Sequence, residues 1–195
     1  MVYKPLSHIT RSGISMIIGL TGENCAGKGT VAEYLKTKGF LYRSLSDVLR
    51  EELKAEGKEL TRENLIEKGN SLRAEHGPAA LAKKTVERLE EGTDYIIDSI
   101  RNAAEAQEIK SLPNSTLVYV RAPPEVRFER MKARGRESDP QTFEEFQRLE
   151  AREMKNEDKT KQSLVEAFEI ADLELENIGS IEELHKKIDE LLGSL

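Results

Sequence analysis

Five short runs of consecutive apolar residues divide the chain, and each has the length of a buried strand. Runs of this kind are typical of parallel strands that are covered on both faces. The five expected strands are Ile14–Leu20, Phe40–Arg43, Tyr95–Ile100, Thr116–Arg121 and Leu173–Ile178. Segments with helical periodicity separate them. Because strands alternate with helices, the pattern predicts an α/β three-layer sandwich around a five-stranded parallel sheet.

Capping residues and prolines indicate where several of the helices begin. The expected starts are an N-cap at Ser46, one at Thr61, Pro78 and Pro123–Pro124 in first turns, and a capping box of Ser180 with Glu183. Leu65, Ile66, Gly69 and Leu72 fall in helical register and predict the buried stripe of the helix after Thr61. The stretch 46–91 holds three helices and no strand, so we interpret it as a helical excursion between the second and third strands.

Length and composition exclude several classes of protein. The 195 residues fit a single domain. One cysteine and three scattered histidines give neither a disulfide framework nor the spacing of a zinc site. The net charge of −6 argues against a general affinity for nucleic acid or anionic membranes. No apolar run approaches the ~20 residues of a membrane span, and the first fifteen residues lack a signal-peptide core. We expect a cytoplasmic monomer or homodimer with a flexible extension at 1–13.

A glycine-rich segment between the first strand and the first helix carries the strongest functional signal. It reads Gly22-Glu23-Asn24-Cys25-Ala26-Gly27-Lys28-Gly29-Thr30. Such a loop wraps backbone N–H groups around an anion, and the following helix directs the positive end of its dipole at the same point. Lys28 adds an ammonium group for the β- and γ-phosphates. All nine residues, 22–30, are therefore predicted to bind ATP, with Cys25 as a small filler of the loop.

A carboxylate at the end of the third strand predicts a magnesium site. Asp98 follows the apolar residues 95–97, and in a parallel sheet it would lie beside the phosphate loop. Mg²⁺ prefers oxygen ligands, so we expect Asp98 and the hydroxyl of Thr30 to organise its surroundings. A helix cap or an ordinary strand end is the alternative for Asp98 alone. Arg101 would face the transferred group or the phosphate of the acceptor. Tyr42 and Tyr95 are interpreted as strand-packing residues.

Arginines concentrate between 121 and 136. Arg127, Arg130 and Arg134 recur at helical spacing. A solvated helix face is the ordinary interpretation of such a run. The rigid guanidinium fork, however, suits phosphate oxygens, and positioned cations are the main catalytic device in phosphoryl transfer. We therefore expect Arg130 and Arg134, or Arg136, to be catalytic or to belong to a short lid over residues 134–148.

These motifs resemble those of adenylate kinase and related P-loop nucleoside-monophosphate kinases. Gly27–Thr30 resembles the phosphate loop of that family, although Gly29 stands where the commonest form has Ser or Thr. Ser44–Arg50 is similar to the segment that ends in a phosphate-binding arginine. Asp98–Arg101 is similar to the Asp-Gly-Phe-Pro-Arg segment, shortened by one residue. The central part, with Leu72-Arg73, is more like phage-type deoxynucleotide kinases and archaeal relatives of adenylate kinase.

The resemblance implies a P-loop NTPase topology with ATP and Mg²⁺, a helical acceptor-binding region over 46–91 and a lid without the cysteine-rich zinc site. Arg50, Arg73 and Arg101 would then bind the acceptor. Three cations favour a nucleoside or deoxynucleoside monophosphate, which needs no general base. Asp47 leaves open a hydroxyl-directed kinase resembling dephospho-coenzyme A kinase, with Asp47 as the base. An ATP-binding regulator without efficient transfer is the third alternative, and a helix-surface ion pair is the plain alternative for Arg50.

Overall fold

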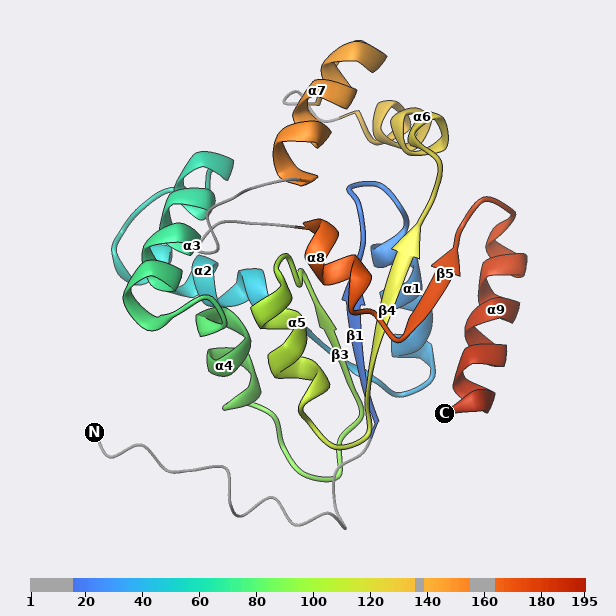
Figure 1. Cartoon of the computed structure of the whole chain (residues 1–195), viewed down its shortest axis with the longest axis horizontal. Helices are drawn as coiled ribbons and strands as arrows, with labels where there is room; N and C mark the ends of the chain where they lie inside the picture. Colours follow the sequence, from blue (N-terminus) through green and yellow to red (C-terminus); the bar gives the residue numbers. More distant parts are fainter. Residues whose placement is uncertain (1–15, 136–138, 155–163) are drawn as a thin grey trace.

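A parallel five-stranded sheet forms the centre of the computed structural model, which describes residues 16–135, 139–154 and 164–195 (Figure 1). Its strands are β1 (Ile17–Thr21), β2 (Leu41–Ser44), β3 (Tyr95–Asp98), β4 (Ser115–Arg121) and β5 (Leu173–Glu176). They lie in the order β2-β3-β1-β4-β5, and every neighbouring pair is parallel. All five expected strands are confirmed, with shifted ends. The strand expected to reach Ile100 stops at Asp98 because Ser99 adopts a left-handed φ of 67°.

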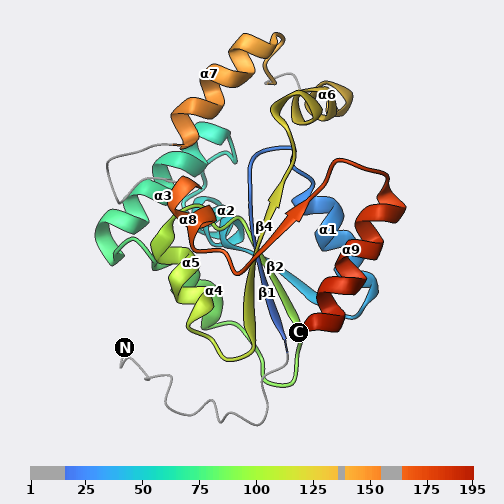
Figure 2. The same cartoon turned by 45° about the vertical axis from the view of Figure 1, so that its right-hand side comes forward.

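The helices are distributed unevenly over the two faces of the sheet (Figure 2). They are α1 (Lys28–Thr37), α2 (Leu45–Ala55), α3 (Arg62–His76), α4 (Ala80–Val86), α5 (Ala103–Lys110), α6 (Pro124–Arg134), α7 (Phe143–Met154), α8 (Leu164–Glu169) and α9 (Ile181–Ser194). Helices α1 and α9 cover one face, and α2–α5 with α8 cover the other. The expected three helices between the second and third strands are therefore confirmed as α2, α3 and α4.

Two separate apolar cores hold these layers together. Ile18 and Leu20 of β1 belong to the core under α1 and α9, and Ile17 belongs to the core under the other helices. This division follows from the strand repeat of two, which sends successive side chains to opposite faces. The sheet is thus covered on both faces, as the uninterrupted apolar runs predict.

Two helix starts differ from the sequence expectations. Helix α4 begins at Ala80 with Ala79 as its N-cap, so Pro78 lies before the helix and not in its first turn. Ser44, not Ser46, caps α2: its hydroxyl accepts from the Ser46 backbone N–H at 3.2 Å, and Asp47 accepts from the Ser44 N–H at 3.3 Å. Both serines have capping chemistry, and the end of β2 at Ser44 decides between them. Ile66 is 42% exposed and lies outside the buried stripe that we expected for α3. The caps at Thr61 and Ser180 are confirmed.

Helices α6 and α7 pack against each other beyond the carboxyl ends of the strands (Figure 1). Phe128 of α6 packs against Phe143 and Phe146 of α7, with ring centroids 5.4 and 5.7 Å apart. The Arg127 guanidinium is buried and pairs with Glu150 across the same contact. Within the lid expected at 134–148, Arg134 ends α6 and residues 143–148 belong to α7. Residues 136–138 and the extension expected at 1–13 lie outside the described residues.

Candidate functional site

The loop between β1 and α1 has the backbone conformation that a phosphate loop requires. Gly22 has φ of 145°, and a Cβ there would collide with the carbonyl oxygen of Val120. Gly27 has φ of 108° and is the N-cap of α1, where no side chain caps the first turn. Cys25 also takes a left-handed φ, of 61°. The loop therefore curls tightly onto the start of α1, whose first N–H groups have no intrahelical partner and can bind an anion.

Lys28 reaches back over this loop from the first turn of α1. Its ammonium donates hydrogen bonds to the carbonyl oxygens of Gly22 at 2.6 Å and Glu23 at 2.9 Å. Burial lowers the pKa of Lys28 from its ordinary value, the Asp98 charge opposes that lowering, and the Arg101 charge adds to it. A second anionic group beside Lys28 would favour the charged ammonium. The side chain is thus placed to pair with phosphate oxygens.

Asp98 stands at the end of β3, and both of its carboxylate oxygens accept hydrogen bonds. The Tyr42 hydroxyl donates to Oδ2 at 2.8 Å, and the Ser99 backbone N–H donates to Oδ1 at 2.6 Å. The Ser44 and Ser99 hydroxyls are bonded to each other at 2.9 Å. In the β2–β3 register Tyr42 pairs with Ile96, two residues before Asp98 in the same strand. Tyr42 therefore does more than the strand packing that we had expected, because its hydroxyl orients the Asp98 carboxylate.

One cavity of about 620 Å³ joins the loop, Asp98 and two of the arginines. Its lining comprises Asn24, Cys25, Gly27, Lys28, Gly29, Thr30, Asp98, Arg130, Arg134, Asn177, Gly179, Ile181 and Leu184. The structure thus brings six residues of the predicted phosphate loop together with Asp98, Arg130 and Arg134, whereas Gly22, Glu23, Ala26 and Arg101 lie outside this lining. The hydroxyl of Thr30 and the carboxylate of Asp98 are the hard oxygen donors that suit Mg²⁺, which usually keeps waters and substrate phosphates as its other ligands.

The segment after β5 forms a wall of the cavity that the sequence reasoning missed. Asn177 is buried, and its side-chain amide donates to the Ala26 carbonyl at 2.9 Å. Arg130 donates to the Asn177 carbonyl at 3.0 Å and to Ala26 at 3.3 Å. In a parallel sheet, the loops after all strands meet at the carboxyl edge. That rule is the signal that could have placed Asn177 beside the phosphate loop.

The lid arginines have different surroundings. Arg134 lines the cavity and forms an ion pair with Asp139 at 2.6 Å. Arg130 is held between the phosphate loop and Asn177. Arg127 shares their helical spacing, but its guanidinium is buried against Glu150 and the Ala122 carbonyl. Only two of the three helically spaced arginines therefore reach the cavity.

None of the four residues expected to bind the acceptor belongs to that cavity lining. Arg50 is exposed and pairs with Asp47 at 2.8 Å, so the plain alternative of a helix-surface ion pair describes it as it stands. The expectation for Arg73 was wrong, because this residue is 3% exposed and its guanidinium is paired with the buried Glu105 at 2.7 Å instead of facing an acceptor. The Asp47 carboxylate also accepts the Ser44 N–H in the capping box of α2, so both of its oxygens already have partners.

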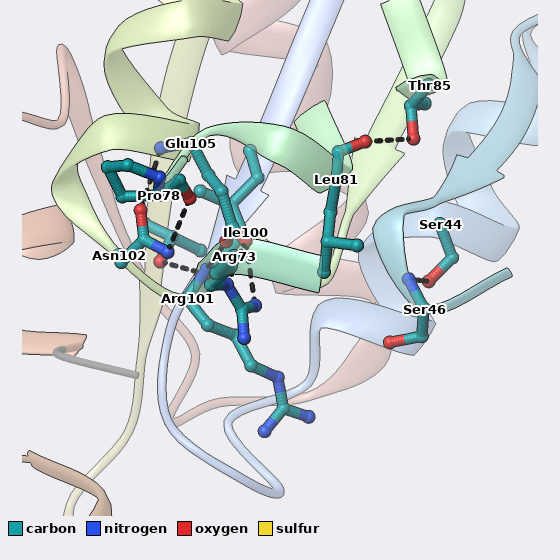
Figure 3. Close-up of polar contacts among 11 residues, drawn as sticks. Ser44, Ser46, Arg73, Pro78, Leu81, Thr85, Ile100, Arg101, Asn102 and Glu105 are labelled. Carbon is teal, nitrogen blue, oxygen red and sulfur yellow. Dashed lines mark hydrogen bonds and ion pairs between the residues drawn. The ribbon is translucent and has the colours of Figure 1, made fainter. Parts of the chain in front are cut away.

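Arg101 is placed differently from Arg73, although the two lie close together (Figure 3). Its side chain extends away from Glu105 on the side of the β1–α1 loop. The positive charge of Arg101 adds to the lowering of the Lys28 pKa. The Glu23 side chain is engaged elsewhere, because its carboxylate accepts a hydrogen bond from the Tyr119 hydroxyl at 2.6 Å. Glu23 therefore contributes to the loop through its backbone.

Comparisons with known proteins extend these observations. Residues 18–174 match the model of a family described as an AAA domain. A UPF0200 protein of Thermococcus gammatolerans is 36% identical over 187 residues, covering 92% of this chain and 95% of its own. A UPF0200 protein of Sulfurisphaera tokodaii is 34% identical, covering 90% of this chain and 95% of its own.

Solved structures share the same architecture. TT1252 from Thermus thermophilus superposes with a TM-score of 0.59 and 25% identity, covering 93% of this chain and 98% of its own. Shikimate kinase from Acinetobacter baumannii superposes with a TM-score of 0.56 and 18% identity, covering 92% and 93%. These likenesses show a P-loop NTPase fold of the kinase-like type. In the described residues no helix is long and apolar enough to cross a membrane.

Proposed function

This chain belongs to the UPF0200 family and carries its AAA domain, and we propose that it is an ATP-dependent kinase of a small anionic acceptor. One observation carries the proposal: a single cavity gathers Lys28, Thr30 and Asp98 with the lid arginines Arg130 and Arg134. A phosphate loop alone suits any nucleotide-binding protein. The arginines add the cations that stabilise charge on a migrating phosphoryl group, and they favour transfer over mere binding.

In the proposed reaction, the phosphates of ATP bind over residues 22–30. The first backbone N–H groups of α1 and the Lys28 ammonium hold the β- and γ-phosphate oxygens. Asp98 and Thr30 would hold Mg²⁺, which neutralises charge on those phosphates when bound. Arg130 fixes the loop through the Ala26 carbonyl. Arg134, which lines the cavity, would exchange its ion pair with Asp139 for a phosphate oxygen when ATP binds.

The acceptor would bind on the side of α2–α4, with Arg101 at its anionic group. A terminal acceptor oxygen attacks the γ-phosphorus in line, and the bond from that phosphorus to the β,γ-bridging oxygen breaks, leaving ADP. Arg101 and Lys28 offset the repulsion between the two anions. A nucleoside or deoxynucleoside monophosphate is the first class to test, because its phosphate needs no general base.

A hydroxyl-directed kinase is the second candidate, and the burial of Arg73 against Glu105 favours it. With Arg73 sequestered by Glu105 and Arg50 paired with Asp47, fewer cations serve the acceptor than the sequence suggested. Asp47 would have to leave both the capping box and Arg50 to act as a base. The monophosphate therefore keeps the first place.

An acceptor panel tests the proposal. ADP formation is measured with Mg-ATP and each of the common nucleoside and deoxynucleoside monophosphates, with dephospho-coenzyme A, with shikimate and with water alone. Stimulation by one monophosphate class supports the proposal, and stimulation by an alcohol alone selects the second candidate. ATP binding without acceptor-stimulated ADP release would instead favour a regulatory nucleotide-binding protein.

A further inference from the structure

A fully buried ion pair lies directly behind Arg101 and takes no part in the reaction described above. Glu105 is 0% exposed and Arg73 is 3% exposed. Arg73 donates two hydrogen bonds to Oε1 of Glu105, from Nε at 2.9 Å and from Nη2 at 2.7 Å. Moving two charges from water into the protein interior costs free energy, and a protein with apolar residues of similar size in place of a buried ion pair is often equally stable. Stability alone therefore does not explain why this pair is buried here.

The second carboxylate oxygen of Glu105 binds the backbone of the segment after Asp98. Oε2 accepts a hydrogen bond from the backbone N–H of Arg101 at 2.9 Å. One carboxylate thus joins a side chain of α3 to the backbone of the segment that follows Asp98 (Figure 3). The Arg73 donors occupy Oε1, so the carboxylate is oriented with Oε2 toward Arg101.

Other buried contacts fix the same segment. The Thr21 hydroxyl, at the end of β1, donates to the Ile100 carbonyl at 3.1 Å. Asn102 accepts from the Glu105 backbone N–H at 2.8 Å and donates to the Pro78 carbonyl at 3.3 Å. The segment 100–102 is therefore held by β1, by α5 and by the connection between α3 and α4.

The sequence of α3 makes room for this arrangement. A Cβ on Gly69 would come within 3.1 Å of Nη1 of Arg73 and 3.5 Å of a Leu49 methyl group. A larger residue at position 69 would crowd the guanidinium where α3 meets α2. Gly69 thus serves the turn of Arg73 into the interior, which accounts for a glycine in the middle of a helix despite its poor helix propensity.

We infer that Glu105 is a positioning residue: its Oε2 orients Arg101 toward the phosphoryl-transfer site, and its Oε1 ties that orientation, through Arg73, to helix α3 of the acceptor region. The inference rests on the proposed function for the consequence in turnover, and on the geometry alone for the orientation of Arg101. Misplacement of a positioned group by about 1 Å can cost on the order of 100-fold in rate.

Two double variants separate positioning from stability. Arg73→Met with Glu105→Leu removes both charges and the carboxylate that accepts from the Arg101 N–H. Arg73→Met with Glu105→Gln also removes both charges, but its side-chain carbonyl can still accept from that N–H. Glu52→Gln with Lys84→Gln is the matched control, because it removes an ion pair between α2 and α4 that does not contact Arg101.

The experiment measures hydrogen exchange of the Arg101 amide by NMR, together with kcat and acceptor KM for the acceptor found in the panel. We expect fast Arg101 exchange and a 10- to 100-fold lower kcat/KM in the Leu variant, at unchanged ATP affinity. The Gln variant should recover most of both, and the control should resemble the wild type. Equal exchange and equal turnover in the Leu and Gln variants would overturn the inference.

Failure of the proposed function gives a different result. If the wild-type protein phosphorylates no acceptor, the function fails, and the Arg101 exchange rates still decide whether Glu105 holds the segment. If the Leu variant does not fold, the Gln variant is compared with Glu105→Gln alone, in which Arg73 keeps its charge. Slow Arg101 exchange in both supports the inference, and fast exchange in either one overturns it.

Discussion

The hydroxyl of Tyr42 in β2 donates a hydrogen bond over 2.8 Å to Oδ2 of Asp98, which ends the neighbouring strand β3. The bond leaves Asp98 oriented by a group on each oxygen, since the Ser99 N–H binds Oδ1. Groups that orient a ligand of a metal commonly matter almost as much as the ligand itself. Tyr42 is thus an orienting partner of the residue that we propose to hold Mg²⁺.

Replacing Tyr42 by Phe should raise the Mg²⁺ concentration needed for half-maximal turnover by about tenfold, because Asp98 loses its second hydrogen bond. The measurement is a Mg²⁺ titration at saturating ATP. Tyr34→Phe is the control, because the Tyr34 hydroxyl binds the exposed Asp189 far along the chain. An unchanged Mg²⁺ dependence in Tyr42→Phe would separate Tyr42 from the metal site.

Two tyrosines should titrate late in the folded protein. Burial raises the pKa of Tyr42 and of Tyr119, and the nearby carboxylates of Asp98 and Glu23 add to the effect. A pKa that is higher in the folded state contributes stability below the unfolded value of about 10, and that stability is lost as the pH rises toward the folded value.

The ultraviolet absorbance of phenolate, followed from pH 8 upward, tests this expectation. Part of the tyrosine signal should appear only at a pH above that of free tyrosine, or when the protein unfolds. The late fraction should be smaller in Tyr42→Phe than in Tyr34→Phe. Identical late fractions in these two variants would contradict the environment described for Tyr42.

The motif-bearing parts of the site were predictable because their chemistry is local in the sequence. Gly22, Gly27 and Lys28 lie within seven consecutive residues between a strand and a helix, so the motif can be recognised without knowing which distant residues pack on it. Asp98 was predictable for a related reason: it ends a buried strand, and strand ends meet at one edge of a parallel sheet.

Cys25 offers a chemical readout of the cavity. It is the single cysteine of the chain and lines the cavity beside Lys28. Burial raises the pKa of the Cys25 thiol, and the positive charge of Arg134 only partly opposes this. Because the thiolate is the reactive form, alkylation by iodoacetamide should be slow at pH 7 and accelerate as the pH rises toward 9.

Mg-ATP should slow that alkylation several-fold at every pH, since its phosphates would cover the loop. The rate is followed by mass spectrometry, with AMP at the same concentration as the control ligand. Alkylation that is equally fast with Mg-ATP and without it would place the nucleotide away from Cys25.

Arg50 is the test of the acceptor side. If it exchanges Asp47 for an acceptor phosphate, Arg50→Ala should raise the acceptor KM about tenfold at nearly constant kcat, as for an interaction shared by ground and transition states. Lys54→Ala, one helical turn further along α2, is the control. An acceptor KM equal to that of the wild type would leave Arg50 as a surface residue paired with Asp47.

The parts that sequence reasoning missed depend on packing between distant segments. Arg73 was expected in the acceptor site because arginine suits phosphate, yet its direction is set by Glu105, 32 residues away. Asn177 meets Ala26 across 151 residues, and neither residue signals the other. Periodicity locates a helix, but the partner of an individual polar side chain depends on how the helices pack.

The most direct test of the account is a crystal structure with Mg²⁺ and a non-hydrolysable ATP analogue. We predict the β- and γ-phosphates within hydrogen-bond distance of the backbone N–H groups of 27–30, with the Lys28 ammonium moved from the Gly22 carbonyl onto them. A triphosphate bound elsewhere, or a loop whose N–H groups bind no phosphate at saturating analogue, would contradict the proposed kinase.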